Sequence, residues 1–339
     1  MKTKRPTLYD VAREANVSYQ TVSRVINDKA HVSEETRERV QKAIKTLGFR
    51  PNRAAQIMQT EQSDTIEVVL FYSGFNLFLY EMARIVQQLG YHFVISAITD
   101  ADFARTLESA ASRFVDGLII VPDTRLRGGY EELKALTGGI PFIQVGAPLG
   151  ASVPSVIYDQ VQGARLATQH LIDLGHQHIA EISGPLRNQD GYDRHTSWIA
   201  TLRDAGLEVG VSIESDFTID GGYQAMRHLL ESGTEFTGVF IANDSMAFGA
   251  HTAIREYGLR VPDDISIVSF DDIPESAHFV PGLTTVRQDF NLLGRMAVEY
   301  LVEIIENPNM AVHQRVLQPK LIIRESTAAL TDQRVNLIR

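Results

Sequence analysis

Residues 7–26 read TLYDVAREANVSYQTVSRVI, and this stretch decides the fold of the first part of the chain. Thr7 and Asp10 have the spacing of a capping box, so a helix is predicted to begin at Leu8. Its apolar residues recur at helical spacing up to residue 15. The segment 16–18 interrupts the pattern, and Ser18 is suited to cap a second helix. Two short helices joined by a tight turn are typical of a helix-turn-helix.

A third helix is predicted after this pair. Ser33 is a suitable N-cap, the acidic residues that follow it favour the positive end of the helix dipole, and Gly48 is a typical stop signal. Apolar residues at helical spacing in 40–47 give this helix an inner face. The expected head, residues 1–50, is therefore an all-α domain of three helices.

The outward face of the second predicted helix carries Tyr19, Gln20, Ser23 and Arg24. An arginine can donate twice to a guanine edge, a glutamine can pair with adenine, and a tyrosine ring can contact a thymine methyl. These residue types are suited to reading the major groove of DNA. The alternative for these four residues is an ordinary solvated helix face.

The charge of the chain is unevenly distributed. The formal net charge is -10, but the first 60 residues hold 12 basic and 6 acidic side chains, while the remainder holds 20 basic and 36 acidic ones. A basic head on an acidic body favours nucleic-acid binding by the head. With 0 cysteines the chain has no disulfides or thiolate metal sites, and we expect no metal and no cofactor. It contains no membrane-length apolar run and no secretory signal, so we expect a cytoplasmic protein without membrane contact.

The segments TLYDVA, VSYQTVSRV and PNRAA resemble the LacI/GalR (lac repressor) family of bacterial transcriptional regulators, and the similarity extends over nearly the whole chain. The resemblance implies that Tyr19, Gln20 and Arg24 read bases, and that the operator half-site is similar to the lac one. It also implies a set of residues that contact or position the DNA backbone: Leu8, Ser18, Thr21, Ser23, Asn27, His31, Ser33 and Thr36. Phosphate contacts set the register, whereas base contacts set the sequence.

Residues 51–62 connect the head to the body. Asn52 can cap a helix over 53–59, but seven or eight residues do not hold a helix alone in water, so an unstructured linker is the alternative. The resemblance implies a hinge helix that folds on the minor groove with an apolar wedge, which is Met58 in this chain. The residues assigned to this hinge contact are Asn52, Ala55, Gln56 and Met58.

The body, residues 63–330, alternates short apolar runs with helical stretches, which favours α/β architecture with doubly wound parallel sheets. Strands are predicted at 65–71, 92–98, 117–121, 142–145, 178–182, 238–242 and 265–270. The resemblance implies a periplasmic-binding-protein-like type I body of two lobes. The first lobe would hold about 63–158 and 290–317, the second about 159–289 and 318–330, and 331–339 would be a short tail. The helix predicted at 290–306 would belong to the first lobe.

Polar residues at predicted strand ends are candidates for a ligand cleft, because ligands of such sheets bind at the carboxyl ends of strands. An arginine, an asparagine and an aspartate suit adjacent sugar hydroxyls, although an aspartate after a strand is more often a cap or turn residue. The resemblance implies that Arg194, Asn243 and Asp271 contact the effector, with Phe217 and Phe290 as walls. Gln162 and Phe71 are further effector-binding candidates, although Gln162 and the aromatic segment 71–80 depart from the lac-type pattern. The aromatic segment could stack a ring of the ligand or pack the interface between the lobes. Asp244 and Asp272 are interpreted as structural.

The predicted function is a ligand-responsive DNA-binding repressor: a homodimer binds a near-palindromic operator, and a small effector, a sugar, releases it. The tail is too short for a leucine-heptad tetramer. A sugar-binding transport protein is the alternative that the body alone would support. An enzyme is the third possibility, but the chain has no catalytic motif of the hydrolase, phosphate-loop or metalloprotease type.

The hinge assignment makes a prediction. Met58→Asp is expected to abolish high-affinity operator binding, because a charged side chain cannot wedge between stacked bases, and to leave weak, salt-sensitive binding. A gel-shift titration measures it. Unchanged affinity would contradict a wedge role for Met58.

Overall fold

The computed structural model describes residues 6–26, 32–50, 63–71, 78–99, 102–122 and 129–330. They form two compact units that divide after Ser63. In the part of the chain so described, no helix is long and apolar enough to cross a membrane.

The first unit contains three helices, α1 (Leu8–Glu14), α2 (Tyr19–Ile26) and α3 (Glu34–Leu47). The predicted capping box is present, since the Thr7 side chain accepts from the Asp10 amide and the Asp10 side chain accepts from the Thr7 amide. α3 begins after its cap Ser33 and ends at Gly48, whose φ of 60° is easy for glycine. One apolar face of each helix packs into a shared core: Val11, Ala12, Ala15, Val22, Val25, Val40, Ala43 and Phe49. The three-helix prediction is confirmed.

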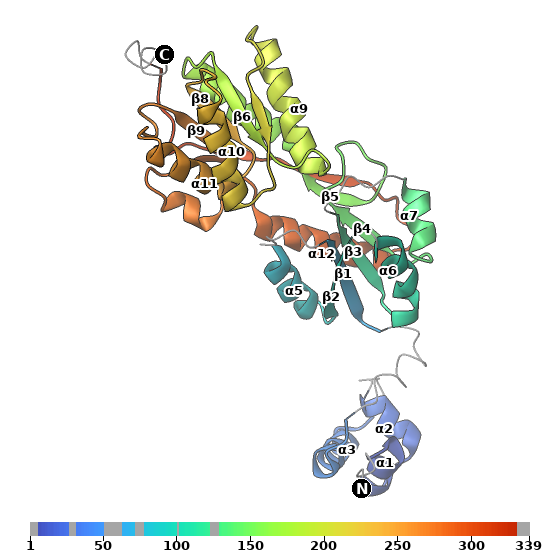
Figure 1. Ribbon diagram of the computed structural model, residues 1–339. Coiled ribbons are helices and arrows are strands. Elements are labelled where there is room, and N and C mark those ends of the chain that lie inside the picture. The colour runs from blue at the N-terminus through green and yellow to red at the C-terminus, as the bar shows by residue number, and fades with distance from the viewer. Residues whose placement is uncertain are drawn as a thin grey trace. The chain divides into compact units, whose positions relative to one another are not determined.

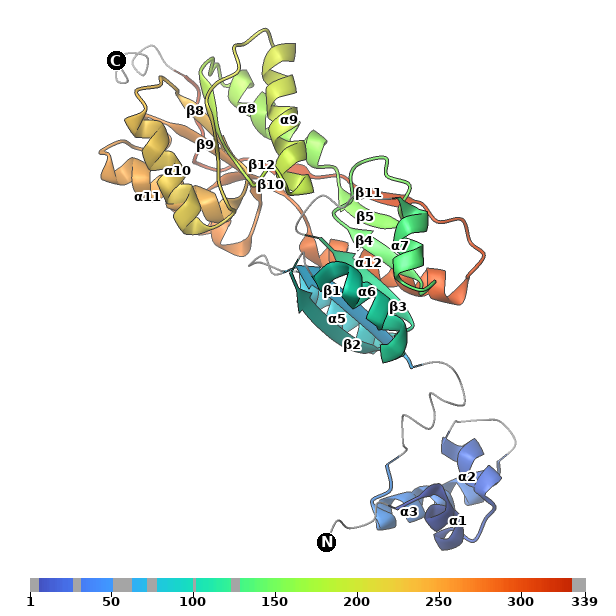
Figure 2. The ribbon, with the colours of Figure 1, turned by 45° about the vertical axis from the view of Figure 1, so that its right-hand side comes forward.

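The second unit contains two six-stranded sheets, each with helices on both faces (Figure 1). In the first lobe the strand order is β11-β5-β4-β3-β1-β2. Its strands are β1 (Thr65–Phe71), β2 (His92–Ile98), β3 (Gly117–Val121), β4 (Phe142–Val145), β5 (Ser155–Tyr158) and β11 (Gln314–Leu317). α5 (Phe78–Gln88) and α12 (Phe290–Glu306) cover one face, while α6 (Phe103–Ala110) and α7 (Tyr130–Leu136) cover the other (Figure 2).

The second lobe repeats this design with the order β12-β10-β9-β8-β6-β7. Its strands are β6 (Ile179–Ser183), β7 (Ser212–Glu214), β8 (Gly238–Ile241), β9 (Ser266–Asp271), β10 (Thr284–Arg287) and β12 (Lys320–Ile322). α8 (Gln160–Asp173) and α9 (Gln189–Asp204) pack on one face, while α10 (Ile219–Glu231) and α11 (Asp244–Glu256) pack on the other. The predicted fold of two parallel-sheet lobes is confirmed, with β12 as an antiparallel exception.

Three segments cross between the lobes: β5 to α8, β10 to α12, and β11 to β12. They are bonded to each other at the crossing. The Asp289 amide donates to the Tyr158 hydroxyl over 2.8 Å, and the Asp159 amide donates to the Leu317 carbonyl over 3.0 Å. The chain therefore holds its two lobes together through a small, hydrogen-bonded junction.

The strand predictions hold where apolar runs are long. β1, β2, β3 and β4 have the predicted bounds, β6 and β9 begin and end one residue later than predicted, and β8 ends one residue earlier. Five strands were not predicted: β5, β7, β10, β11 and β12. Each is three or four residues long and begins with a polar residue, unlike the equally short β4 and β8, which were predicted.

A close contact between α8 and β9 makes a prediction. A Cβ at Gly163 would lie 2.4 Å from the Phe270 ring, so glycine is required for this packing. Although alanine normally favours a helix interior, we expect Gly163→Ala to lower the free energy of unfolding by about 1–3 kcal/mol in urea titrations. The added Phe270→Leu change makes room, so the double variant should lose less than the sum of the single variants. Increased stability of Gly163→Ala would contradict the packing argument.

Candidate functional site

The outward face of α2 presents polar side chains to solvent. Val22 and Val25 are buried in the head, which turns Gln20 and Arg24 outward, where both are exposed. Tyr19 is half-buried at the start of the same helix. The three residues that the sequence singles out as base readers therefore lie on one accessible surface, with side-chain donors and acceptors available to a partner.

Tyr9 on α1 also belongs to this surface and was missed in the sequence. Its ring centroid lies 4.9 Å from that of Tyr19, while 68% of Tyr9 is exposed. The signal that could have found it is the position of an aromatic residue outside the apolar stripe of α1. The contact fixes the direction of the Tyr19 ring, so α1 and α2 form the surface together.

Most described members of the predicted backbone-contact set lie at or near helix starts; Ser23 lies in the middle of α2. Ser18 and Thr21 share a hydroxyl contact of 2.9 Å, and Ser33 donates to Thr36 over 2.9 Å. Their hydroxyls thus cap the helices while staying near the surface. Leu8 and Ser23 are half-buried. The predicted contacts Asn27, His31, Asn52, Ala55, Gln56 and Met58 lie outside the described residues.

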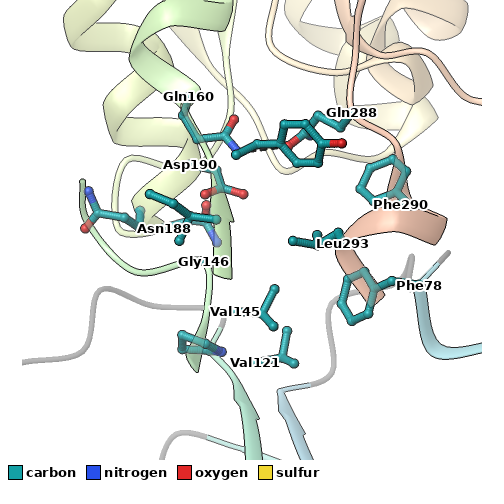
Figure 3. Close-up of a pocket in the computed structure, with 14 residues that line it drawn as sticks. Phe78, Val121, Val145, Gly146, Gln160, Asn188, Asp190, Gln288, Phe290 and Leu293 are labelled. Carbon is teal, nitrogen blue, oxygen red and sulfur yellow. Dashed lines mark hydrogen bonds between the residues drawn. The ribbon is translucent and has the colours of Figure 1, made fainter. Parts of the chain in front are cut away.

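A cavity of about 100 Å³ lies between the two lobes of the body (Figure 3). The first lobe supplies a mostly apolar wall: Phe78, Val121, Pro122, Val145, Gly146, Ile157, Tyr158, Phe290 and Leu293. The second lobe and the crossing segments supply a polar wall: Gln160, Asn188, Gln189, Asp190 and Gln288. The cavity is therefore amphipathic, with its polar side chains gathered on one side.

Arg194 of α9 lies behind this polar wall and is 3% exposed. Its guanidinium stacks on the Phe270 ring at 3.8 Å. Its Nε donates to Gln160 Oε1 over 2.9 Å, and its Nη1 donates to the Ala242 carbonyl. One turn further along α9, Trp198, the 1 tryptophan of the chain, is fully buried in the same cluster as Phe270. Arg194 is thus held rigidly, as a buried cation must be.

Asp271, at the end of β9, faces Arg194. Its Oδ1 lies 3.6 Å from Arg194 Nη2 and accepts from Gln288 Nε2 over 2.8 Å. Burial raises the pKa of Asp271 to about 7, although the charge of Arg194 opposes this shift. The backbone φ of Asp271 is 112°, an unusual value for a non-glycine residue. Asp271 therefore changes charge near neutral pH.

The other predicted effector residues occupy different places. Asn243 caps α11, and its Nδ2 donates to the Phe217 carbonyl over 3.1 Å. The half-buried Phe217 ring packs where a Cβ at Gly184 would be, 2.2 Å away. Phe290 lines the cavity. Gln162 is half-buried in the first turn of α8 and is absent from the described lining, and the side chain of Phe71 lies outside what is described.

Two aspartates interpreted as structural are confirmed in that role. Asp244 is buried and accepts from the Ser276 and Thr285 hydroxyls and the Ile273 amide. Asp272 pairs with Arg287 at 2.5 Å and Arg324 at 2.6 Å. Among the described residues, no group of three or more His, Asp or Glu side chains is arranged to hold a metal ion.

Comparison with known proteins matches both units. Residues 7–52 match the family described as bacterial regulatory proteins, lacI family, and residues 168–327 match the periplasmic binding protein-like domain. The lactose operon repressor of Escherichia coli K12 is 36% identical over 97% of this chain and 93% of its own length. A crystal structure of the lac repressor dimer bound to operator and the anti-inducer ONPF covers 96% of this chain and 100% of its own, with TM-score 0.90 and 34% identity. A transcriptional regulator CelR–cellobiose complex covers 95% and 100%, with TM-score 0.71 and 34% identity.

The pairing of Arg194 with Asp271 makes a prediction about stability. Arg194→Met leaves a buried carboxylate without its cation, which costs about 3–5 kcal/mol when that carboxylate is charged. Because Asp271 has a pKa of about 7, and loss of Arg194 raises it further, the cost is expected to be larger at pH 8 than at pH 6. Urea unfolding at both pH values measures it. Arg165→Met, at an exposed position of α8, is the control; an equal cost for Arg194→Met at both pH values would contradict the assignment.

Proposed function

The chain belongs to the lacI family of bacterial regulatory proteins, and on this premise we propose how it recognises DNA and its effector. It is a DNA-binding transcriptional repressor and not an enzyme. The supporting observation is that one chain carries both an exposed α2 reading face and an amphipathic cavity between two lobes. We place it in the cytoplasm, where a bacterial operator lies.

The DNA half of the proposal assigns base reading to α2. Gln20 and Arg24 are exposed one turn apart on the helix, so both can enter the major groove together. Tyr19, whose ring lies against that of Tyr9, supplies an aromatic ring at the N-terminus of α2. Ser18, Thr21, Ser33 and Thr36 lie where hydroxyls can contact the phosphates. This arrangement supports a half-site of the lac type.

The ligand half of the proposal assigns an uncharged glycoside to the cavity. Its hydroxyls would face the amides and carboxylate of the second lobe, while an apolar or ring-shaped group would face Phe78, Phe290 and Leu293 of the first lobe. Among the described lining residues only Asp190 carries a charge, and it is negative. Arg194, which lies 3.9 Å from Asp190, is already paired with it, so the described lining offers a phosphate no unpaired cation, whereas a neutral glycoside satisfies both walls.

The cavity size supports a coupled movement of the lobes. Its volume of about 100 Å³ is smaller than the roughly 300 Å³ at the lower end of ordinary ligand pockets. A glycoside must therefore separate the lobes before it can enter. Because the lobes are joined only by short crossing segments in the described chain, that separation changes their relative orientation. We propose that this change releases the operator, with reciprocal coupling between effector and DNA.

The proposal also requires two copies, since a near-palindromic operator has two half-sites. An exposed apolar hollow of the second lobe is suited to this contact. It is lined by Phe248, Pro274, Glu275, His278 and Phe279, and the adjacent Val280 is 83% exposed. Apolar side chains exposed in this way are typical of surfaces that another protein covers. We therefore assign this hollow to the dimer interface.

The test is a fluorescence-anisotropy titration of a symmetric lac-like operator at fixed salt, with and without galactosides, glucosides, cellobiose and purines. We expect tight binding that one glycoside weakens. Arg24→Ala should lower operator affinity about 5- to 150-fold for each half-site, the loss of about 1–3 kcal/mol for one bidentate base contact. Arg227→Ala, at an exposed position of α10 in the body and paired with Glu231, is the matched control.

The alternative function, a sugar-binding protein without a role in transcription, predicts a different result. Operator and random DNA would bind equally, and Arg24→Ala and Arg227→Ala would behave alike. Weakening of the operator complex only by a purine would leave the DNA half of the proposal intact and reject the glycoside.

A further inference from the structure

Four side chains at the junction of the lobes form a closed ring of polar contacts. Arg194 Nε donates to Gln160 Oε1 over 2.9 Å. Gln160 Nε2 donates to Gln288 Oε1 over 2.9 Å, and Gln288 Nε2 donates to Asp271 Oδ1 over 2.8 Å. The 3.6 Å ion pair between Asp271 and Arg194 closes the ring. We call these four residues the amide ring.

Two members of the amide ring line the cavity, and the other two do not. Gln160 and Gln288 line the cavity, where Figure 3 shows both on the same side of it. Arg194 and Asp271 do not belong to the described lining. The two glutamines, together with Asp190, whose Oδ2 lies 3.9 Å from Arg194 Nη2, therefore stand between the cavity and the charged pair.

The direction of each hydrogen bond follows from the two charged members. A guanidinium only donates and an ionised carboxylate only accepts. When Asp271 is ionised, Gln160 turns its oxygen to Arg194, Gln288 turns its nitrogen to Asp271, and the remaining nitrogen and oxygen then meet. Each amide both donates and accepts, as a pair of neighbouring sugar hydroxyls does.

From this geometry we propose that Gln160 and Gln288 act as an internal substitute for the ligand. In the empty cavity they satisfy Arg194 and Asp271, and an entering glycoside displaces Gln160 and takes over its contacts. Gln160 is thus a positioning residue that sets the threshold for ligand binding. This inference rests on the proposed glycoside effector.

The position of the ring in the chain gives the displacement a mechanical consequence. Gln160 is the first residue of α8, directly after one crossing segment, and Gln288 lies on another. Their neighbours Tyr158 and Asp289 are hydrogen bonded to each other. Breaking the Gln160–Gln288 contact therefore removes one of the bonds that hold two crossing segments together. Ligand entry and loosening of the junction become the same event.

The experiment compares ligand affinities of variants of the full chain by calorimetry, with o-nitrophenyl β-D-galactoside and cellobiose as probes. Gln160→Ala is expected to bind the better probe at least fivefold more tightly, because nothing has to be displaced. Gln160→Glu is expected to bind it at least fivefold more weakly, because a carboxylate holds Arg194 more strongly than an amide does. Gln169→Ala, on the same helix and bonded to Asp173, should match the unchanged protein.

Weaker or unaltered binding by Gln160→Ala would overturn the inference, since the first result means a direct ligand contact and the second means no role. If no variant binds either probe, the proposed ligand class fails. A measurement without ligand then tests whether Gln160 covers Arg194. Hydrogen exchange of the Arg194 Nε proton, assigned by its loss in Arg194→Lys, should be at least tenfold faster in Gln160→Ala. Equal exchange would show that Gln160 does not cover Arg194.

Discussion

The buried guanidinium of Arg194 is the constraint on which the centre of the body depends. A cation removed from water needs acceptors for its protons and a negative charge nearby. Three elements supply them: α8 gives an amide at its start, β8 is followed by a carbonyl, and β9 gives a carboxylate at its end and an aromatic face. One side chain thereby fixes the relative positions of α8, α9, β8 and β9.

The position of Arg194 also depends on Gly163. Phe270 can lie under Arg194 only because Gly163 has no side chain at the point where α8 crosses β9. A helix propensity scale would mark that glycine as a weakness of α8. In the packed lobe it is a requirement, since the ring, the guanidinium and the helix cannot otherwise occupy the same space.

Much of the architecture was predictable because local signals agree with the final fold. Thr7, Ser33 and Gly48 set helix ends in the head, and the strands with long apolar runs have the predicted bounds within a residue. The short strands near the crossings were not predicted, because so few residues become a strand only by pairing with strands that are distant in the sequence. The same reason explains why Gln160 and Gln288, 128 positions apart, were not recognised as a pair.

The candidate site shows the same division between local and long-range information. A reading face on one helix follows from helical spacing, so Gln20 and Arg24 could be found from the sequence. Tyr9 required the contact between two helices. In the body, the resemblance to a known family implied roles for Arg194 and Asp271, but only the folded chain shows which side chains stand in front of them.

The buried Trp198 has a further consequence. It lies one turn from Arg194 on α9 and belongs to the same buried cluster as Phe270. Its ring stacks against His195 at a centroid distance of 6.0 Å. The sequence contains 1 tryptophan, so this is the single indole of the chain. Its indole emission, excited at a wavelength that the 11 tyrosines hardly absorb, therefore arises from a single place, one helical turn from Arg194. Trp198 is therefore an intrinsic fluorescent probe of the junction between the lobes, and no dye has to be attached. The head contains no tryptophan and does not contribute to this signal.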